Sequence, residues 1–425
     1  MKKFSILTLG CRVNHYESQV LSEELTRLGY ENAPFTDKCD VYIVNSCAVT
    51  EESVRKSKQM IRRAIKKNPN AFIAICGCAS QLHSEFFAAL EGISFVCGTR
   101  NKEEIIAAIA GKSNIKTSVK TPTGALSPTH ITKFDRTRAY VKIQDGCEGK
   151  CAYCIIPKVR GSIVVRDEEE IVDEVRALAD GGCHEIVLTG IETSAYGKGL
   201  SRLIKRISQI NGIERIRMGS LDPSFLKPEF IDEIYNIPQV CPHFHISLQN
   251  GSDRILNSMR RKYNTEMIEK SVSYIRSKMP NVNFSADVIV GFPGESDEDF
   301  DMTCQLVQRI GFLHLHIFTY SKRPDTEAAT MKGQIAESVK TDRLHRLSEI
   351  ADGCKNAILD DLISSGENVY VLVETANKGY LTGHTDNFIE CRIPIKEGIE
   401  PSLLKGTLIS VRPKEISDGY LICSI

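Results

Sequence analysis

The sequence predicts an α/β protein in three parts: an N-terminal parallel sheet covered by helices, a central partial barrel of six βα units, and a small C-terminal all-β barrel. Short apolar runs alternate with helical patterns in two separate series, a polar segment divides the series, and the tail consists of closely spaced β-like segments. A chain of 425 residues is also too long for one ordinary core, so several domains are expected.

The first series occupies residues 1–112. Its strands are expected at residues 5–9, 41–45, 72–75 and 95–96, and its helices at residues 18–28, 51–67, 80–90 and 102–110. Strands that alternate with helices in this way form parallel sheets with helices on their faces. Residues 113–135 are rich in Ser, Thr, Pro, Gly and Lys and are interpreted as a linker between domains.

Three cysteines follow the first three strands of this series. Cys11, Cys47 and Cys78 each open the loop before a helix. Ligands of open α/β sheets bind at the carboxyl ends of the strands, so these three residues are expected to converge in space. Cysteine also packs well in a core, but core packing does not explain why all three lie in strand-to-helix loops. Cys76 is a nearby rival of Cys78, and we interpret it as structural.

The second series covers residues 136–362 and predicts a partial parallel barrel. Six strands are expected at residues 139–144, 185–188, 215–219, 243–248, 284–290 and 314–320, with helices such as residues 168–179 and 266–278 between them. Residues 337–362 are expected to form one or two helices. In residues 363–425, five short strands with Gly-containing turns predict a small all-β barrel.

A second cysteine set lies within one short loop, which contains Cys147, Cys151 and Cys154. Clustered thiolates suit zinc or an iron–sulfur cluster. A structural zinc site requires four ligands, and no fourth Cys or His follows at the usual spacing. A cubane cluster held by three cysteines keeps one iron open, which is a catalytic arrangement. Zinc remains the alternative for this loop.

The composition limits the class of protein. Fifteen cysteines without a signal peptide indicate metal or redox chemistry in a reducing compartment, and therefore a cytoplasmic protein, rather than a disulfide scaffold. No apolar run reaches the length that a membrane-spanning helix needs. Lys+Arg and Asp+Glu both number 54, so the net charge gives no argument for a nucleic-acid partner.

The second cysteine loop also carries a family resemblance. Its sequence, GCEGKCAYCIIP, resembles the methylthiotransferase family of the radical S-adenosylmethionine superfamily. Other segments agree with that family in the same order over nearly the whole chain: LGCRVNHYES, VNSCAVTEES, CGCASQ, LTGIETSAYG, HISLQNGSDRILNSMRRKY, SADVIVGFPGESDEDF and FTYSKRPDTEAAT. The resemblance implies a radical S-adenosylmethionine barrel at the centre and an RNA-binding TRAM-like barrel at the C-terminus.

The resemblance implies two [4Fe–4S] clusters and S-adenosyl-L-methionine as cofactors. Cys147, Cys151 and Cys154 would ligate the cluster that reduces S-adenosylmethionine. Cys11, Cys47 and Cys78 would ligate an auxiliary cluster that carries sulfur. Six residues near the carboxyl ends of the barrel strands or in the cysteine loop are candidates for contacts with the cofactor, with a structural role as the alternative for each: Tyr153, Gly190, Ser220, Asp222, Gln249 and Asp287. No side chain is identified as a catalytic acid or base.

The resemblance also predicts the reaction and its partners. Arg12 and Val13 are similar to the residues of the type that modifies threonylcarbamoyl-adenosine next to the tRNA anticodon. Two S-adenosylmethionine equivalents would be used to place a methylthio group on carbon 2 of the adenine. The alternatives are isopentenyl-adenosine in tRNA, a ribosomal protein aspartate, and a non-enzymatic metal-containing RNA-binding protein. A flavodoxin or ferredoxin as electron donor, and a monomeric state, are further expectations.

Local charge is basic around the second cysteine loop. Eight Lys and Arg residues between residues 130 and 166 oppose three acids and would attract a phosphate backbone: Lys133, Arg136, Arg138, Lys142, Lys150, Lys158, Arg160 and Arg166. Another basic run, at residues 55–67, is interpreted as the solvated face of a helix. Asp325 departs from the family pattern, because many relatives have glycine there, and this leaves the role of Arg323 open.

Overall fold

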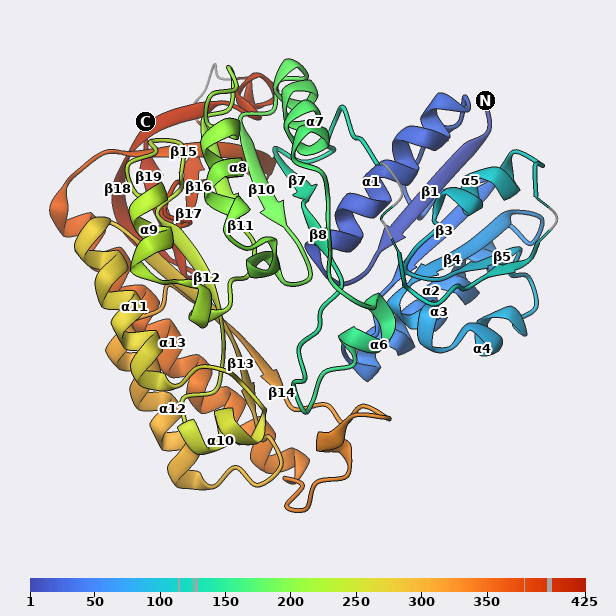
Figure 1. Cartoon of the computed structure of the whole chain (residues 1–425). Coiled ribbons are helices and arrows are strands. Elements are labelled where there is room, and N and C mark those ends of the chain that lie inside the picture. Colours follow the sequence, from blue (N-terminus) through green and yellow to red (C-terminus); the bar gives the residue numbers. More distant parts are fainter. Residues whose placement is uncertain (114, 125, 127–128, 378, 396–399) are drawn as a thin grey trace.

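The computed structural model describes residues 1–113, 115–124, 126, 129–377, 379–395 and 400–425. Its N-terminal part is a six-stranded parallel sheet with the strand order β2-β1-β3-β4-β5-β6. The strands are β1 (Lys3–Thr8), β2 (Glu31–Asn32), β3 (Val41–Ser46), β4 (Phe72–Gly77), β5 (Phe95–Cys97) and β6 (Thr117–Ser118). Their helices are α1 (Arg12–Arg27), α2 (Glu51–Lys67), α3 (Cys78–Leu82), α4 (Ser84–Ala88) and α5 (Glu103–Ile109) (Figure 1).

The predicted parallel sheet is confirmed, but the two-residue edge strand β2 was not expected, and three further details of the prediction are wrong. Helix α1 begins at Arg12 rather than at residue 18, because buried polar side chains such as Asn14 and Glu17 obscure its apolar periodicity. The helix expected at residues 80–90 is divided at His83 into two short helices. The expected linker contributes the edge strand β6, whose two residues are too short to give a pattern. Residues 114, 125 and 127–128 of that linker lie outside the described residues.

The central part contains six parallel strands, as predicted. They form two three-stranded sheets, β11-β10-β7 and β12-β13-β14, which are joined by parallel bridges between Ile216 and Val240 and between Leu221 and Ile246. The strands are β7 (Arg138–Lys142), β10 (Glu185–Thr189), β11 (Arg215–Met218), β12 (His243–Gln249), β13 (Asn283–Val290) and β14 (His314–Thr319). A short antiparallel pair, β8 (Gln144–Asp145) and β9 (Val164–Val165), lies beside β7.

Helices cover the outer face of this partial barrel (Figure 1). They are α7 (Glu168–Asp180), α8 (Gly199–Ile207), α9 (Pro228–Ile234), α10 (Asp253–Ser258), α11 (Thr265–Lys278), α12 (Asp297–Ile310) and α13 (Glu337–Ser365). The short helix α6 (Ile156–Arg160) packs instead on the N-terminal part, where Val159 belongs to a cluster with Val44 and Ile75. The described 3-10 turns are η1 (Thr193–Tyr196), η2 (Pro223–Phe225), η3 (Glu327–Ala329) and η4 (Pro401–Leu404). The helix expected at residues 337–362 is therefore a single helix. Among the described helices, none has the length and apolarity that crossing a membrane requires.

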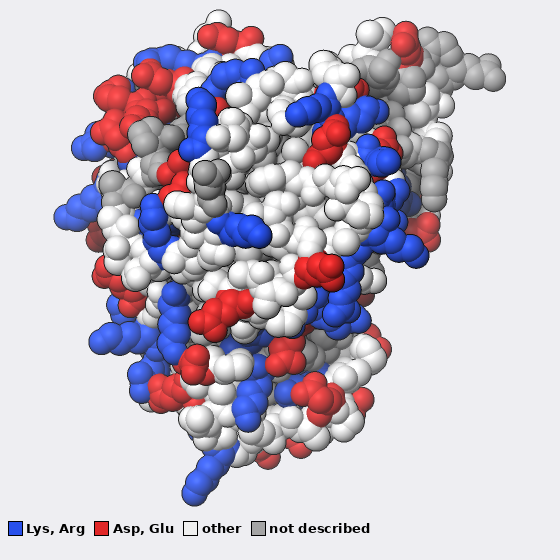
Figure 2. All heavy atoms as spheres, turned by 90° about the vertical axis from the view of Figure 1, so that its right-hand side faces the viewer, with Lys and Arg blue, Asp and Glu red and all other residues white. Residues whose placement is uncertain are grey.

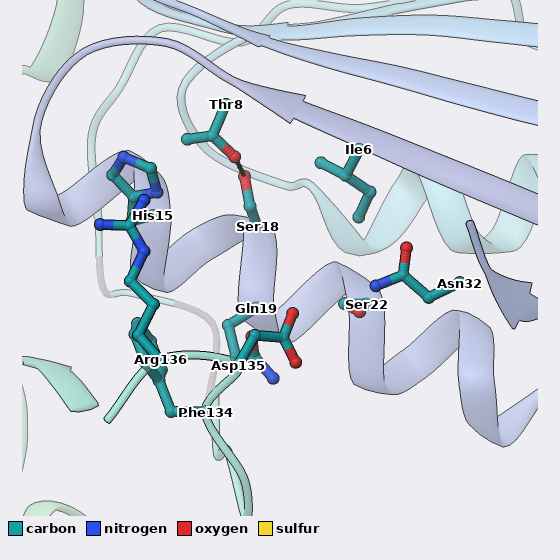
Figure 3. A pocket seen from close by; sticks show the side chains of 10 residues that line it. All are labelled: Ile6, Thr8, His15, Ser18, Gln19, Ser22, Asn32, Phe134, Asp135 and Arg136. Carbon is teal, nitrogen blue, oxygen red and sulfur yellow. Dashed lines mark hydrogen bonds between the residues drawn. The ribbon is translucent and has the colours of Figure 1, made fainter. Parts of the chain in front are cut away.

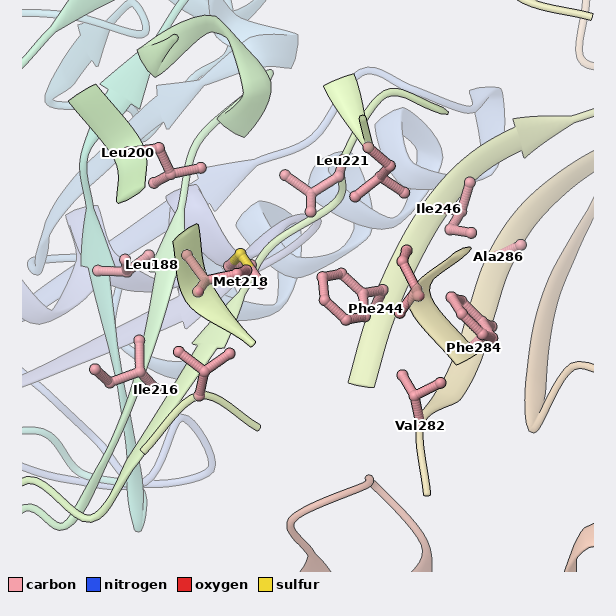
Figure 4. Close-up of a cluster of buried hydrophobic side chains, with 14 of the residues drawn as sticks. Leu188, Leu200, Ile216, Met218, Leu221, Phe244, Ile246, Val282, Phe284 and Ala286 are labelled. Carbon is pink, nitrogen blue, oxygen red and sulfur yellow. The ribbon is translucent and has the colours of Figure 1, made fainter. Parts of the chain in front are cut away.

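Alternate residues of the barrel strands have different surroundings. Leu188, Ile216, Phe244 and Phe284 belong to the large apolar cluster that also contains the inner faces of the helices (Figure 4). Since successive strand residues point to opposite faces, their neighbours point into the barrel. Those neighbours include polar residues such as His245, whose Nε2 lies 3.2 Å from an Asp287 carboxylate oxygen. The barrel interior is therefore polar and able to accommodate polar ligands.

The C-terminal part is a closed five-stranded barrel with the order β15-β16-β17-β19-β18, which confirms the predicted all-β barrel. Its strands are β15 (Val369–Asn377), β16 (Tyr380–Thr385), β17 (Glu390–Pro394), β18 (Leu408–Ser417) and β19 (Tyr420–Ser424). Residues 378 and 396–399 of the predicted region lie outside the described residues.

Two arginines attach this small barrel to the central one. Arg215 donates to the main-chain oxygens of Tyr370 and His384 at 2.8 and 3.0 Å. Arg217 donates to those of Thr385 and Asp386 at 2.7 and 2.6 Å. The hydrogen bonds of the attachment therefore run from arginine side chains on β11 to carbonyl groups of the small barrel, and Leu313 and Leu359 add apolar contacts with its core.

Candidate functional site

The first cysteine set lies at one edge of the N-terminal sheet. Cys11 is the residue before α1, Cys47 follows β3, and Cys78 is the first residue of α3. Strands β1, β3 and β4 are adjacent and parallel, so their carboxyl ends lie at the same edge. Cys47 and Cys78 are buried, whereas Cys11 is exposed. The structure thus brings the three loops together as expected.

Two glycines allow these loops to approach closely. A Cβ atom on Gly10 would lie 2.8 Å from the Cβ and 2.9 Å from the Sγ of Cys47. A Cβ atom on Gly77 would lie 2.4 Å from the main-chain oxygen of Ser46. Both glycines also have positive φ angles, +97° and +95°, which other residues adopt only with strain. The cysteine loops therefore require glycine at both positions.

Replacing Gly77 by alanine should destabilise the protein and loosen the cysteine loops. We expect a loss of about 1–3 kcal/mol in the free energy of unfolding from the strained backbone, with a further loss from the contact with Ser46. Denaturant unfolding measures the effect. Gly111→Ala is the matched control, because Gly111 also has a positive φ of +71° but would place its Cβ in open space. Equal losses in the two variants would contradict the role of close loop packing.

Asn14 holds two of the cysteine loops together. Its buried amide donates to the main-chain oxygens of Leu9 and Ser46, at 2.7 and 3.1 Å, and these residues flank the Cys11 and Cys47 loops. Sequence reasoning missed Asn14, because the helix was expected to begin at residue 18 and the turn that carries Asn14 was not recognised.

Cys76 has different surroundings from Cys78. It is fully buried in a cluster with Phe4, Ala74 and Phe95, and desolvation raises the pKa of its thiol to about 12. On an extended strand Cys76 and Cys78 would point to the same face, but the +95° φ of Gly77 ends the extended backbone between them. These contacts agree with the interpretation of Cys76 as structural.

The second cysteine set occupies the loop between β8 and α6, and charged side chains from the barrel approach it. A carboxylate oxygen of Glu192 lies 3.0 Å from the Sγ of Cys147, and the Arg261 guanidinium donates to the Sγ of Cys151 at 3.0 Å. Burial, followed by Glu192, raises the pKa of Cys147 to about 12, and burial raises that of Cys154 to about 11. Sequence reasoning missed both Glu192 and Arg261.

Asp222 is engaged by neighbouring protein groups. Its carboxylate accepts from Arg261 at 2.8 Å and from the main chain and hydroxyl of Ser224 at 2.9 and 2.6 Å. Asp222 thus connects the end of β11 to the guanidinium on Cys151. Ser220 shares a hydrogen bond of 2.7 Å with Ser247, so these two strand ends meet at the barrel interior.

The other four predicted cofactor contacts each have different surroundings in the structure. Tyr153 packs edge-to-face on Phe292, with ring centroids 6.4 Å apart, in a small apolar cluster. Close packing explains why position 190 is a glycine, because a Cβ atom on Gly190 would lie 2.6 Å from the Gln144 side-chain oxygen. Gln249 ends β12 with a φ of +64°, a strained conformation for a residue with a side chain. Asp287 is half-buried in the barrel interior beside His245.

A buried ionic network lies between the two cysteine sets. Arg160, six residues after Cys154, is fully buried and donates to Glu17 at 2.8 Å and to Asp145 at 3.3 Å. It also donates to the Asn14 side chain, and it lies close enough to Cys78 to lower the pKa of that thiol, which burial raises to about 11. Arg160 therefore joins the α6 segment to the N-terminal sheet.

This network corrects the prediction of a basic surface around the second loop. Lys142, Arg160 and Arg166 are buried and paired with acids, mainly Glu17, Asp145 and Glu174. Arg138 is also paired, with Glu374 at 3.0 Å. The members that stay exposed are Lys133, Arg136, Lys150 and Lys158. The sequence count cannot distinguish paired interior cations from surface cations.

The basic face of α2 is exposed, in agreement with the prediction of a solvated helix face. Arg55 forms a surface ion pair with Glu52, and most other Lys and Arg side chains of this helix are exposed. Basic and acidic side chains are interspersed over most of the face of the molecule seen in Figure 2.

The structure clarifies the departure at Asp325. Asp325 has a φ of +64°, a left-handed conformation that Asp tolerates better than most residues. The backbone therefore keeps the form that glycine would adopt. Arg323 is buried, and Lys158 donates to the main-chain oxygen of Asp325 at 2.8 Å.

A cavity of about 320 Å³ lies between β1, α1 and the segment that enters the barrel (Figure 3). His15, Gln19, Asp135 and Arg136 are among its lining residues. None of the six cluster cysteines lines it, so it is separate from the cysteine loops.

The two donor sets are chemically suited to iron–sulfur clusters. No three His, Cys, Asp or Glu side chains in the described part of the chain are arranged to hold one metal ion. In a cubane cluster each thiolate binds its own iron. The three sulfur atoms therefore need not converge on a single ion. Each set has three thiols in loops, with a guanidinium beside it: Arg160 near Cys78 and Arg261 on Cys151. Such cations stabilise thiolates.

Comparisons with known proteins agree with this site. Residues 141–307 match the Radical SAM superfamily, and residues 3–98 match a family described as Uncharacterized protein family UPF0004. The chain is 36% identical to the threonylcarbamoyladenosine tRNA methylthiotransferase MtaB of Bacillus subtilis, over 97% of this chain and 93% of that protein. It is 34% identical to the tRNA-2-methylthio-N(6)-dimethylallyladenosine synthase of Wolinella succinogenes, over 99% of both.

A solved structure shares the fold. The radical S-adenosylmethionine methyltransferase TsrM of Kitasatospora setae matches with a TM-score of 0.59 and 16% identity over 77% of each chain.

Proposed function

The chain belongs to the radical S-adenosylmethionine methylthiotransferase family, and from this premise we propose that it places a methylthio group on carbon 2 of threonylcarbamoyl-adenosine in tRNA. Membership implies S-adenosylmethionine and a [4Fe–4S] cluster as cofactors. The proposal adds a second cluster and the identity of the nucleoside.

The observation that carries this proposal is the convergence of the Cys11, Cys47 and Cys78 loops beside the segment that follows the second cysteine loop. A barrel that only cleaved S-adenosylmethionine would need one thiolate set. Here a second set of three thiols lies at a sheet edge, and Arg160 and Asn14 connect that edge to α6. We assign the auxiliary cluster to Cys11, Cys47 and Cys78, and the reducing cluster to Cys147, Cys151 and Cys154.

When bound, S-adenosylmethionine supplies a carbon radical in one role and a methyl group in the other. The protein's own contribution is to hold and shield these reactants. Arg261 fixes Cys151 and is itself held by Asp222, at 3.0 and 2.8 Å. Ser220, Gln249 and Asp287 present polar groups at the barrel interior, where they are proposed to contact the cofactor together with Tyr153. Gly190 is proposed to lie next to the cofactor site.

The proposed RNA partner is supported by two exposed lysines: Lys150 lies within the second cysteine loop, and Lys158 follows it. The reaction would take place in the cytoplasm, with a flavodoxin or ferredoxin as electron donor and a monomeric enzyme.

A second candidate substrate is dimethylallyl-adenosine in tRNA, which the 34% identity to the Wolinella enzyme favours.

Analysis of tRNA nucleosides tests the proposal. A strain that lacks this protein should lose 2-methylthio-threonylcarbamoyl-adenosine and accumulate the unmethylthiolated nucleoside, as measured by mass spectrometry. Complementation with the wild-type chain should restore the product, and a Cys151→Ala chain should not. Loss of the dimethylallyl product instead would support the second candidate. Unchanged nucleosides would exclude a tRNA substrate.

A further inference from the structure

Arg12 occupies the junction between the first cysteine set and the barrel. It follows Cys11 directly and is the first residue of α1. One turn later, the His15 ring lies 6.1 Å from the ring of Tyr140 on β7. Residues three apart share one face of a helix, so Arg12 lies on the face of α1 that is directed to β7.

The groups that interact with Arg12 identify where its side chain extends. Tyr140 and Asp287 attract its charge, and both belong to the inward-pointing residues of the barrel strands. The inward-pointing His243 and His316 are also influenced by Arg12. Arg12 is half-buried, and the face of α1 on which it lies packs on β7, so the residue is directed to the barrel interior rather than to bulk solvent.

The other interior charges near Arg12 already have partners. Arg138 pairs with Glu374 at 3.0 Å, and Arg217 pairs with Glu185 at 2.6 Å. Within the described residues, no hydrogen bond or ion pair involves the Arg12 guanidinium. A partly desolvated cation whose five N–H donors have no hydrogen-bonded carboxylate is costly unless a ligand completes it.

The chemistry of the proposed substrate supplies such a ligand. The threonylcarbamoyl group on N6 carries a carboxylate that is ionised at neutral pH. N1 of adenine is bonded both to carbon 6, which bears this group, and to carbon 2, which receives sulfur. A residue that binds the N6 substituent must therefore lie close to the sulfur donor, as a residue next to a cluster cysteine does. A dimethylallyl group is apolar and offers Arg12 no partner.

We propose that Arg12 binds the carboxylate of the threonylcarbamoyl group and so selects this nucleoside over those with apolar substituents. The inference rests on the proposed function, because it assumes a tRNA adenosine in the barrel interior. Arginine suits the task, since its planar fork binds a carboxylate through two parallel hydrogen bonds.

The test uses the reconstituted holoenzyme and two anticodon stem-loops. One carries threonylcarbamoyl-adenosine, and the other carries the same group with the carboxylate converted to a carboxamide. We expect Arg12→Gln to lower kcat/KM for the carboxylate stem-loop on the order of 10- to 100-fold, mainly through KM, the range for a hydrogen bond to a charged group. The variant should lose the preference of the wild type for the carboxylate over the carboxamide.

Two further variants control the result. Arg12→Lys keeps the charge but loses the fork, and it should retain an intermediate preference. Arg27→Gln removes an exposed arginine from the other end of α1 and should keep the wild-type preference. Equal losses on both stem-loops would overturn the proposal, because they would show a structural role beside Cys11. Unchanged kinetics in Arg12→Gln would also overturn it.

The proposed function fails in a distinguishable way. A wild-type enzyme that modifies a dimethylallyl-adenosine stem-loop and neither of the two test stem-loops would overturn both the nucleoside assignment and the role of Arg12.

Discussion

Replacement of Cys47 by alanine should stop methylthio transfer while the enzyme still cleaves S-adenosylmethionine. The change removes one of three thiolates from the first set and leaves the loop with Cys147, Cys151 and Cys154 intact. Anaerobic assays that quantify deoxyadenosine and the methylthio-nucleoside separately measure the effect. Iron should fall from about eight to about four per chain, because a cubane contains four irons.

Cys76→Ala provides the matched control for this variant. Cys76 is also buried at the end of the N-terminal sheet, but it lies in an apolar cluster with Phe4 and Phe95. We expect it to keep both products and the full iron content. Methylthio transfer that persists in Cys47→Ala, or is lost in Cys76→Ala, would show that the ligand assignment is wrong.

The second large effect is expected for Glu17→Gln, which should cost about 3–5 kcal/mol in the free energy of unfolding at neutral pH. The buried Glu17 carboxylate accepts from Arg160, Lys142 and Lys102. Glutamine has nearly the same shape but no charge, so Lys142 and Arg160 would retain only Asp145 as a carboxylate partner, and the ion pair of Lys102 would be lost. Denaturant unfolding of both proteins measures the difference.

The pH dependence provides a further check on Glu17. Burial alone would raise the pKa of its carboxyl, but Arg160, Lys102 and Lys142 hold that pKa well below the usual value of 4.5. A depressed carboxyl pKa stabilises the fold above the unfolded pKa, and this stabilisation is lost as the pH falls below it. The difference between wild type and Glu17→Gln should therefore shrink below about pH 4.

Glu52→Gln is the control for Glu17→Gln, because Glu52 pairs with Arg55 on the surface of α2. Exposed ion pairs contribute little, so this variant should leave stability almost unchanged. A loss in Glu17→Gln no larger than in Glu52→Gln would contradict the importance of the buried network.

The sequence predicted the strands well, because the apolar runs of parallel strands are continuous and punctuated by clear loops. Residues such as Ile43 and Phe244 belong to such runs and are fully buried. The same topology predicted the convergence of Cys11, Cys47 and Cys78, since the ends of adjacent parallel strands must share one edge.

The polar contacts could not be predicted in the same way. Arg160 and Lys142 have the composition of a surface patch, and only the docking of α1 against α6 and β7 shows that Glu17 neutralises them. Arg261 reaches Cys151 across 110 positions of sequence. Such pairs depend on tertiary approach, and neither periodicity nor local spacing contains that information.

The attachment of the C-terminal barrel has a consequence for how the sequence can change during evolution. Arg215 and Arg217 bind main-chain oxygens of residues 384–386, and every amino acid supplies such an oxygen. Substitutions in that turn can therefore accumulate without weakening these bonds, provided that the turn keeps its shape. The two arginines have no such freedom. Related chains should combine constant arginines on β11 with a variable turn opposite them, so the surface of the small barrel can diversify while its position stays fixed.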